Sequence, residues 1–133
     1  MNVNIIQNQN DHIPPPPDHE NILISDLDQL TPNVCNDMIL NNTLNYLTSE
    51  ELTKLLNKIR HGGSISIYSL DITELAKAFY FDNIGIAQLS TLIANQQTQH
   101  SLMELKTFFE QQRYNIENAS IKDLSFYLKV RRP

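Results

Sequence analysis

The sequence is poor in the residues from which many ligand and metal sites are built. Its single cysteine, Cys35, cannot form an intrachain disulfide, and no spacing of cysteine and histidine matches a zinc site. This composition favours a reducing compartment or an intracellular assembly. We expect Cys35 to be a small buried hydrophobic residue, because nothing cationic adjoins it in the sequence to lower the pKa of its thiol.

The sequence also lacks a basic charge excess and a long apolar run. The formal net charge is −5 and the pI is about 5.2, which argues against nucleic-acid binding driven by electrostatics. Lys129, Arg131 and Arg132 are the local exception, and a solvated tail explains them. No run approaches the ~18 apolar residues of a membrane span, and the N-terminus lacks the two regions of a signal peptide. We therefore expect a protein of the cytoplasm, a virion or another intracellular assembly, not exported by a signal peptide.

Glycine is scarce as well, with three residues in the chain, two of them adjacent at Gly62 and Gly63. A phosphate-binding glycine loop follows a strand and opens a helix, so that the helix N-terminal amides point at the anion. The order here is reversed, because a helical apolar pattern precedes the pair and a strand pattern follows it. The glycines are therefore predicted to end a helix, and His61 to be an exposed histidine at its C-terminus.

The remaining composition suits one domain. A chain of 133 residues with 41% apolar content can bury a single compact core. Residues 1–21 are predicted to be a polar, proline-rich arm, in which Pro14 to Pro17 favour a polyproline II spacer and Asn2 to Ile6 could form one short strand. Residues 22–133 are predicted to be the folded domain.

Apolar residues at helical spacing predict four helices after the arm. Thr48 and Glu51 form a capping box before the first, and Asp71 and Ser101 occupy equivalent positions before two others. The aromatic run 79–81 is predicted to be core plus rim, with a partner-binding surface as the alternative. The residues expected to point inward are Leu52, Leu55, Leu56 and Ile59 in the first helix, Ile72, Leu75, Ala76 and Phe79 in the second, Leu89, Leu92 and Ile93 in a short helix from residue 84 or 86 to 94, and Leu102, Leu105, Phe108 and Phe109 in the last.

Strand patterns complete the expected fold. Residues 34–40 end in a continuous apolar triplet, as in a buried strand, and residues 63–69 have a strand-like composition. Residues 114–119 form a further strand candidate. In residues 124–131 apolar and polar side chains alternate, which predicts one covered face. The order predicts an α/β fold whose sheet has about four to five strands and ends in an antiparallel hairpin.

The order of these segments resembles the C-terminal half of class I, Rossmann-like S-adenosylmethionine-dependent methyltransferases, over about residues 22–132. The similar segments are Asp26-Leu27-Asp28-Gln29-Leu30 before the family's fourth strand, residues 37–47 for that strand and its helix, residues 55–67 for the next helix, glycine turn and fifth strand, and His100-Ser101-Leu102, Phe108-Phe109-Glu110 and Tyr114-Asn115-Ile116 for the last helix and final hairpin. The resemblance implies a partial Rossmann-like methyltransferase sheet with flanking helices.

The resemblance also implies a cofactor site. In the family, S-adenosylmethionine (SAM) lies over a glycine-rich turn after the first strand, and an acidic residue at the end of the second strand holds its ribose. By resemblance, Asp26 approaches the adenine, and Asn41 and Asn42 lie where the cofactor and substrate face begins. The sequence departs from the family, because it has no Gly-x-Gly and few residues before Ile22 for those strands and their helices.

These departures decide what we expect of the site. Asp26, Asn41 and Asn42 are expected to be vestigial cofactor-binding positions, and the alternative is turn or helix capping for Asp26 and strand-end capping for the asparagines. Asn41-Asn42-Thr43-Leu44 does not match the Asn-Pro-Pro-aromatic motif of amino-group methylation. We expect no catalytic residue, no metal site and no cofactor.

The expected function is therefore that of a degenerate methyltransferase-like domain, acting as a non-catalytic structural or interaction subunit of a larger assembly, such as a phage virion. The family's fourth strand has only Asn2 to Ile6 to cover its outer edge, so we expect the exposed sheet edge to pair with a protein partner or a second copy. The alternative is a SAM-dependent methyltransferase subunit whose partner chain completes the cofactor site. A third interpretation is an adaptor that docks Pro14 to Pro17 in an aromatic groove.

Overall fold

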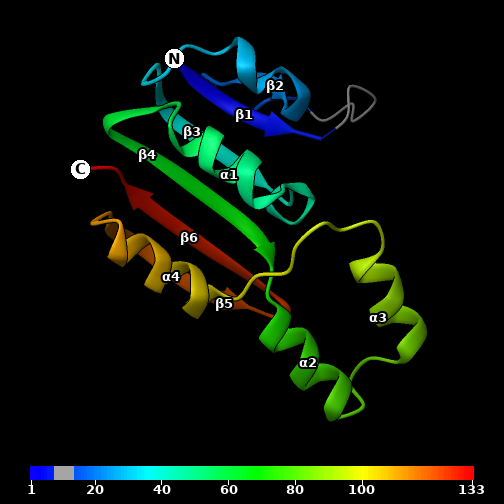
Figure 1. Ribbon diagram of the computed structural model, residues 1–133. Coiled ribbons are helices and arrows are strands. Elements are labelled where there is room, and N and C mark those ends of the chain that lie inside the picture. The colour runs from blue at the N-terminus through cyan, green and yellow to red at the C-terminus, as the bar shows by residue number, and fades with distance from the viewer. Residues whose placement is uncertain (8–13) are drawn as a thin grey trace.

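The computed structural model describes residues 1–7 and 14–133, and its centre is one six-stranded sheet in the order β2-β1-β3-β4-β6-β5 (Figure 1). The neighbours among β1 to β4 are parallel, whereas β6 is antiparallel to both β4 and β5. The strands are β1 (Asn2–Ile6), β2 (Glu20–Leu23), β3 (Cys35–Asn41), β4 (Ile59–Leu70), β5 (Asn115–Lys122) and β6 (Ser125–Arg131). The helices are η1 (Ile24–Gln29) and η2 (Leu44–Tyr46), both 3-10 helices, and α1 (Ser49–Leu56), α2 (Ile72–Tyr80), α3 (Ile86–Ile93) and α4 (Leu102–Gln111). The predicted α/β fold with a final hairpin is confirmed, with six strands where four to five were expected.

The N-terminal segment is part of this sheet. β1 lies between β2 and β3, with Ile5 opposite Leu40, and both Val3 and Ile5 are buried. The boundary expected at residue 21 falls inside β2, so the expected arm contains β1 and the first two residues of β2, which belong to the domain's own sheet. The physical reason is that the apolar side chains of β1 extend the covered face by one strand. Residues 8–13 of the expected arm lie outside the described residues.

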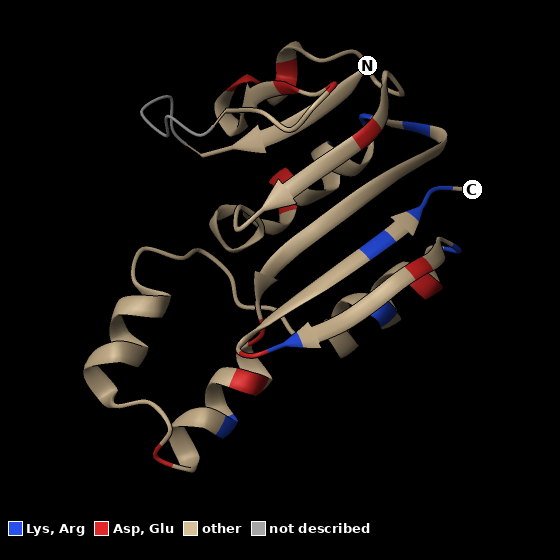
Figure 2. Ribbon diagram, turned by 180° about the vertical axis from the view of Figure 1, so that it is seen from behind, with Lys and Arg blue, Asp and Glu red and all other residues tan. Residues whose placement is uncertain are grey.

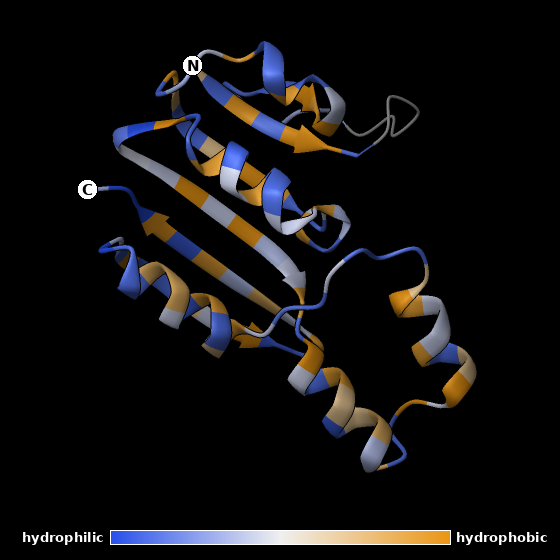
Figure 3. Ribbon diagram, viewed as in Figure 1, coloured by the Kyte–Doolittle hydropathy of each residue, from blue (hydrophilic) through white to orange (hydrophobic). Residues whose placement is uncertain are grey.

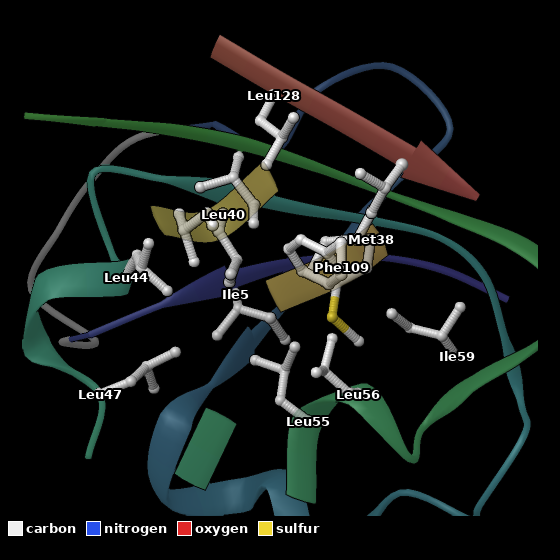
Figure 4. Close-up of a cluster of buried hydrophobic side chains, with 14 of the residues drawn as sticks. Ile5, Met38, Leu40, Leu44, Leu47, Leu55, Leu56, Ile59, Phe109 and Leu128 are labelled. Atoms are coloured by element: carbon white, nitrogen blue, oxygen red, sulfur yellow. The ribbon is translucent and has the colours of Figure 1, made fainter. Parts of the chain in front are cut away.

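One face of the sheet is apolar and is covered by α1 and α4 (Figures 1 and 4). Apolar residues alternate with polar ones along the long strands, as Figure 3 shows, and the predicted alternation in β6 buries Phe126, Leu128 and Val130. Leu55 of α1 and Phe109 of α4 pack into the same core. Cys35 is also buried there, as predicted, and this burial raises the pKa of its thiol. The core therefore lies on one side of the sheet.

The opposite face is polar, and no helix covers it in the described part of the chain (Figures 1 and 2). The register places Tyr68 opposite Tyr127 on this face. The connection from β1 to β2 reaches it through His19, whose Nε2 lies 2.8 Å from Oδ2 of Asp37. We call this surface the open face, and its central residues are Asp37, Ser64, Ser66, Tyr68, Tyr127 and Lys129.

The glycine pair lies inside a strand and not at the end of a helix. α1 ends at Leu56, and Ile59, predicted to be its last inward residue, opens β4 opposite Cys35. Between Ile59 and Ser64 the register of β4 against β3 shifts, and Gly62 adopts a left-handed φ of 79°. The predicted helix stop is therefore wrong, and the glycines form a bulge in β4.

Pairing with the C-terminal segment explains this difference. The Gly62 N–H donates to the Arg132 carbonyl (2.9 Å), and the Arg132 N–H donates to the Gly63 carbonyl (2.8 Å). These bonds hold the backbone at the glycines in an extended strand, at the position where the sequence predicts the end of a helix. His61, predicted to be a helix-terminal histidine, is instead an exposed strand residue whose Nδ1 lies 2.9 Å from the Pro133 carbonyl oxygen.

The predicted helix starts are confirmed. Thr48 and Glu51 form the reciprocal capping box, with distances of 3.2 Å to the Thr48 hydroxyl and 3.1 Å to the Glu51 carboxylate. Asp71 caps α2, and Ser101 caps α4. Local side-chain to backbone bonds of this kind depend on sequence spacing alone, which is why they could be predicted.

Three residues of α2 and α3 that were predicted to point inward are exposed. The predicted core position Phe79 is exposed, as are its neighbours Tyr80 and Phe81, and Ile93 of α3 is exposed as well. Ala76 also faces solvent, whereas Leu75 and Ala78 form the buried side of α2, in a small cluster that includes Ile84. Figure 1 shows the reason, because α2 and α3 extend beyond the end of the sheet, where the described chain covers one side of them only.

Candidate functional site

Two pockets meet at the carboxyl end of β3, where the predicted site residues Asn41 and Asn42 lie. Asn42 leaves the strand with a left-handed φ of 57°, a conformation that asparagine tolerates better than most residues. Its N–H donates to the Tyr68 carbonyl (2.8 Å), and its Nδ2 donates to Oδ1 of Asn41 (3.3 Å). Both asparagines are therefore held at the sheet end, beside open space.

The smaller pocket, of about 200 Å³, lies between the ends of β1 and β3. Buried Thr43 bridges these strands by donating from Oγ1 to the Ile5 carbonyl (2.9 Å). Buried Asn4 donates from Nδ2 to Oδ1 of Asn21 (2.9 Å), whereas its own Oδ1 has no partner in the described part of the chain. An orphaned buried acceptor is a place where a donor from a ligand, a water or a partner chain can bind.

The larger pocket, of about 630 Å³, opens on the open face and is within the size range of small-molecule sites. Its wall is the stacked pair of Tyr68 and Tyr127, with ring centroids 4.6 Å apart and ring planes at 27°. Burial, followed by the influence of Tyr127, raises the pKa of Tyr68, so this phenol stays neutral. The other lining residues are Asn41, Asn42, Ser69, Leu70, Ser120, Lys122, Asp123, Leu124, Ser125 and Phe126.

The chemistry of this lining suits binding better than proton transfer. A stacked aromatic wall with nearby amides and hydroxyls can hold a planar, polar ligand. The lining includes neither histidine nor cysteine, so it offers no side chain that ordinarily titrates near neutral pH. Tyr68 and Tyr127 were not predicted as site residues, because only the register between β4 and β6 brings them together.

Asp26, the third predicted site residue, lies apart from the two asparagines. It is in η1, the 3-10 helix that follows β2, and its Oδ1 accepts a bond from Nε2 of Gln29 (3.4 Å). It lines neither of the two pockets at Asn41 and Asn42. The structure therefore brings together two of the three residues.

A second polar cluster joins the crossover to the open face. The Ser64 hydroxyl donates to Oδ1 of Asp37 (2.8 Å), and the His19 ring contacts Oδ2 of Asp37 (2.8 Å) and the Pro17 carbonyl (2.8 Å). The carboxylate lies between serine and histidine, so His19 does not contact the Ser64 hydroxyl as the histidine of a catalytic triad does. Burial alone would lower the pKa of His19, but the bonds to Pro17 and Asp37 outweigh it and raise that pKa. We assign this cluster a tethering role.

The described residues form neither a metal-binding cluster nor a membrane-spanning helix. None of their histidine, cysteine, aspartate and glutamate side chains gather in a group of three or more that could bind a metal ion. None of the helices within residues 1–7 and 14–133 has the length and apolar character needed to cross a membrane.

The site can be compared with what SAM would need. If β3 corresponds to the family's fourth strand, β1 and β2 are parallel strands that precede it in the chain. We expected few residues before Ile22 for such strands and their helices. The two strands are present, so this expectation holds for the helices only. Residues 7–19, which join β1 to β2, contain no glycine, and their described part has no helix. The pocket beside them is smaller than the roughly 300 Å³ at the lower end of ligand sites. The described residues therefore do not by themselves form the glycine-lined cradle of the family.

Neither a protein-family model nor a curated protein matches the sequence. Solved structures do match. Geranyl diphosphate methyltransferase in complex with GPP and sinefungin has a TM-score of 0.58 at 9% identity, and the match covers 86% of this chain and 52% of that chain. A SAM-dependent methyltransferase from Archaeoglobus fulgidus has a TM-score of 0.58 at 11% identity, covering 98% and 75%. An S-adenosylmethionine-dependent methyltransferase from Mesorhizobium loti has a TM-score of 0.57 at 11% identity, covering 86% and 68%.

The matches differ in how much of the neighbour they cover. The chain spans 52% of geranyl diphosphate methyltransferase, and 36% of an O-methyltransferase family protein from Burkholderia thailandensis. At identities of 9 to 12% the likeness concerns the fold. The neighbours agree with the resemblance drawn from the sequence and with the six-stranded sheet. The chain therefore has a partial class I methyltransferase fold.

Proposed function

We propose that this protein is a non-catalytic, methyltransferase-like subunit that contributes a binding surface to a larger assembly and does not bind SAM by itself. The observation that carries the proposal is the open face. Sheets of parallel strands normally have helices on both faces, because the helices that connect the strands pack on either side. Here one face has helices and the other offers a polar surface with stacked tyrosines, which suits a protein partner.

The connection between β1 and β2 supports the same proposal. A methyltransferase that binds SAM in the manner of the family needs a glycine-rich turn at this point, and residues 7–19 contain no glycine. Side chains beyond Cα prevent the backbone from approaching a ligand closely. A virion is one assembly in which such a subunit could serve.

We place the partner contact on the open face and not on a sheet edge. The edge strand β2 has four residues, and the edge strand β5 is interrupted by a bulge between Ile116 and Asn118. β5 also carries the charged residues Glu117 and Lys122. Short length, bulges and charges are the features by which natural sheets discourage edge pairing.

A second candidate function is a methyltransferase subunit completed by a partner chain. Two observations favour it over other enzyme functions, namely the Oδ1 of Asn4, which has no partner among residues 1–7 and 14–133, and the meeting of two pockets at Asn41 and Asn42. A partner that covered the open face could supply a glycine-rich turn next to these residues. The two candidates differ in one measurable property, which is SAM binding by the complex.

Calorimetric titration of the full chain with SAM, S-adenosylhomocysteine and sinefungin tests the proposal. We expect no heat of binding and no rise in unfolding temperature, since a ligand at 100 times its Kd would stabilise the fold by about 2.7 kcal/mol. Micromolar binding by the isolated chain would refute the proposal. Binding only after a partner is added would favour the second candidate.

The partner is tested by affinity capture from the native source followed by mass spectrometry. The wild-type chain is compared with Tyr68→Asp, which places a charge on the open face, and with Met103→Asp, which places one on the exposed side of α4. We expect the Tyr68 variant to lose a partner that the Met103 variant keeps. Equal capture by all three chains would contradict the open-face contact.

A further inference from the structure

The second unusual surface is the helical arm, which we define as residues 72–93 and which contains α2 and α3. It projects beyond the end of β4, away from the core between the sheet and α1 and α4 (Figure 1). α3 consists of apolar and uncharged polar residues, and none of them is fully buried. Ile86 is 65% exposed and Ile93 is 36% exposed. Within the described chain, α3 packs only on the side of Leu89 and Leu92, against the cluster under α2, and its other side is uncovered.

The end of α2 adds an aromatic surface to the arm. Phe79, Tyr80 and Phe81 are 41%, 80% and 67% exposed, and the rings of Tyr80 and Phe81 make an edge contact with centroids 5.1 Å apart. With 150–250 Å² for each aromatic side chain, these three expose roughly 400 Å². The largest exposed apolar patch of a monomeric protein is roughly 300–600 Å² and is often a functional surface.

Charge indicates which partner this surface fits. Residues 83–103 contain no aspartate, glutamate, lysine or arginine, and Figure 2 shows α3 free of charged residues. The whole chain has a net charge of −5, so two copies repel each other on average. Contact through α3 brings no like charges together. An anionic membrane is a poorer partner, because lipid-binding helices have lysine or arginine on their polar face.

The periodicity of α3 defines how two copies can meet. Leu89 and Leu92 face the cluster under α2, whereas Ile86, Ser90 and Ile93 follow at helical spacing on an adjacent stripe. Two such stripes can pack about a two-fold axis near Ser90, with each copy presenting the same surface.

The exposed aromatic side chains account for about half of the area that a symmetric pair needs. Burial of the aromatic residues in both copies would remove about 800 Å² from water, and a stable interface buries about 1,600 Å² in total. The outer surface of α3 in each copy has to supply the remainder. We propose that the arm is a self-association surface and that a second copy of this chain docks on it, α3 against α3.

Light scattering coupled to size-exclusion chromatography tests the proposal on the full chain. We expect wild type to show twice the chain mass of 15.3 kDa at tens of micromolar. The double variant Ile86→Glu with Ile93→Glu should be a monomer, since it places like charges across the axis. The matched control is Met103→Glu, because Met103 is 70% exposed but lies on α4, and it should remain a dimer. A wild-type monomer, or a double variant that is still a dimer, would overturn the proposal.

Disulfide trapping distinguishes the arm from a sheet edge. The only native cysteine is buried, so a single introduced cysteine reports on its own surroundings. Oxidised Ser90→Cys should run as a covalent dimer, whereas Ser120→Cys, on the exposed edge strand β5, should not. Cross-linking of the Ser120 variant alone would show edge pairing and refute the arm contact. Neither outcome depends on SAM binding, so a failure of this proposal can be distinguished from a failure of the proposed function, which the SAM titration tests.

Discussion

At the scale of single residues, two carboxylates connect segments that are far apart in the sequence. Asp71 was predicted to cap α2, and it does so by accepting from the N–H groups of Thr73 and Glu74. Its second oxygen also accepts from the Leu102 N–H (2.9 Å), which joins the start of α2 to the start of α4. The first function follows from local spacing and was predictable. The second depends on tertiary position and was not.

Asp37 makes the other long-range connection, and its bond to His19 gives a testable pH dependence. The pKa of His19 is raised in the folded state by its bonds to Pro17 and Asp37, which outweigh the opposing effect of burial. His19 therefore binds its proton more tightly in the folded state than in the unfolded state, so protonation stabilises the fold. The resulting stability is fully present below the ordinary histidine pKa and is lost as the pH rises through the folded-state pKa.

We predict that His19→Gln lowers the free energy of unfolding more at about pH 5.5 than at about pH 8.5. Urea denaturation of variant and wild type at both pH values measures the difference. Asp37→Asn should likewise lower the free energy of unfolding more at the lower pH than at the higher pH. Burial lowers the pKa of His100, so this residue has the opposite effect on the pH dependence of stability. Because wild type and both variants contain His100, its contribution cancels in the differences between them. A wild-type minus variant difference that does not change with pH would contradict the prediction.

At the scale of elements, the glycine pair is the main correction. Ile59 satisfies two patterns at once, since it continues the apolar face of α1 and also begins an extended segment. Short apolar runs are ambiguous between helix and strand in this way. The choice was made by pairing with Cys35 in β3 and by hydrogen bonds to Arg132 near the C-terminus. Neither partner is close in sequence.

The two glycines are predicted to be unequal. A Cβ at Gly63 would lie 2.9 Å from the Cys35 carbonyl and 3.0 Å from the Asn36 and Arg60 carbonyls, all backbone atoms that cannot easily move. Gly63→Ala should cost at least about 2 kcal/mol of unfolding free energy. A Cβ at Gly62 would meet nothing within 4 Å, but its φ of 79° is strained for alanine, at about 1 kcal/mol.

Urea denaturation, analysed with a common m-value, measures which glycine variant loses more unfolding free energy. Gly62→Asn provides the control. Asparagine tolerates the left-handed region, so Gly62→Asn should be less destabilising than Gly62→Ala. Equal losses for the alanine variants at both glycines would show that β4 relaxes around the bulge, contrary to the close contacts described.

At the scale of the whole molecule, stability is distributed unevenly. β3 and β4 are inner strands with buried residues such as Met38 and Ile65. The helical arm of residues 72–93 is instead attached through a small separate cluster. Segments with few buried contacts open locally at low free-energy cost, and inner strands open only with the whole fold.

We predict that amides of α3 exchange with solvent much faster than those of β3 and β4 in samples dilute enough to be monomeric. Hydrogen–deuterium exchange followed by mass spectrometry measures this directly. At higher protein concentration the exchange of α3 should slow, because a second copy would cover it. Protection of α3 equal to that of β3 in dilute samples would contradict the prediction.

The sequence by itself determined the helix starts, the alternation in β6 and the order of segments that identifies the fold. These follow from local chemistry, because caps and periodicity involve residues within about one turn or one strand of each other. Tertiary structure alone decided that β1 is an inner strand, that the glycines lie in β4, that Tyr68 stacks on Tyr127 and that the aromatic end of α2 is exposed. Each of these depends on which distant segment lies alongside, and long-range pairing leaves no signature in local spacing.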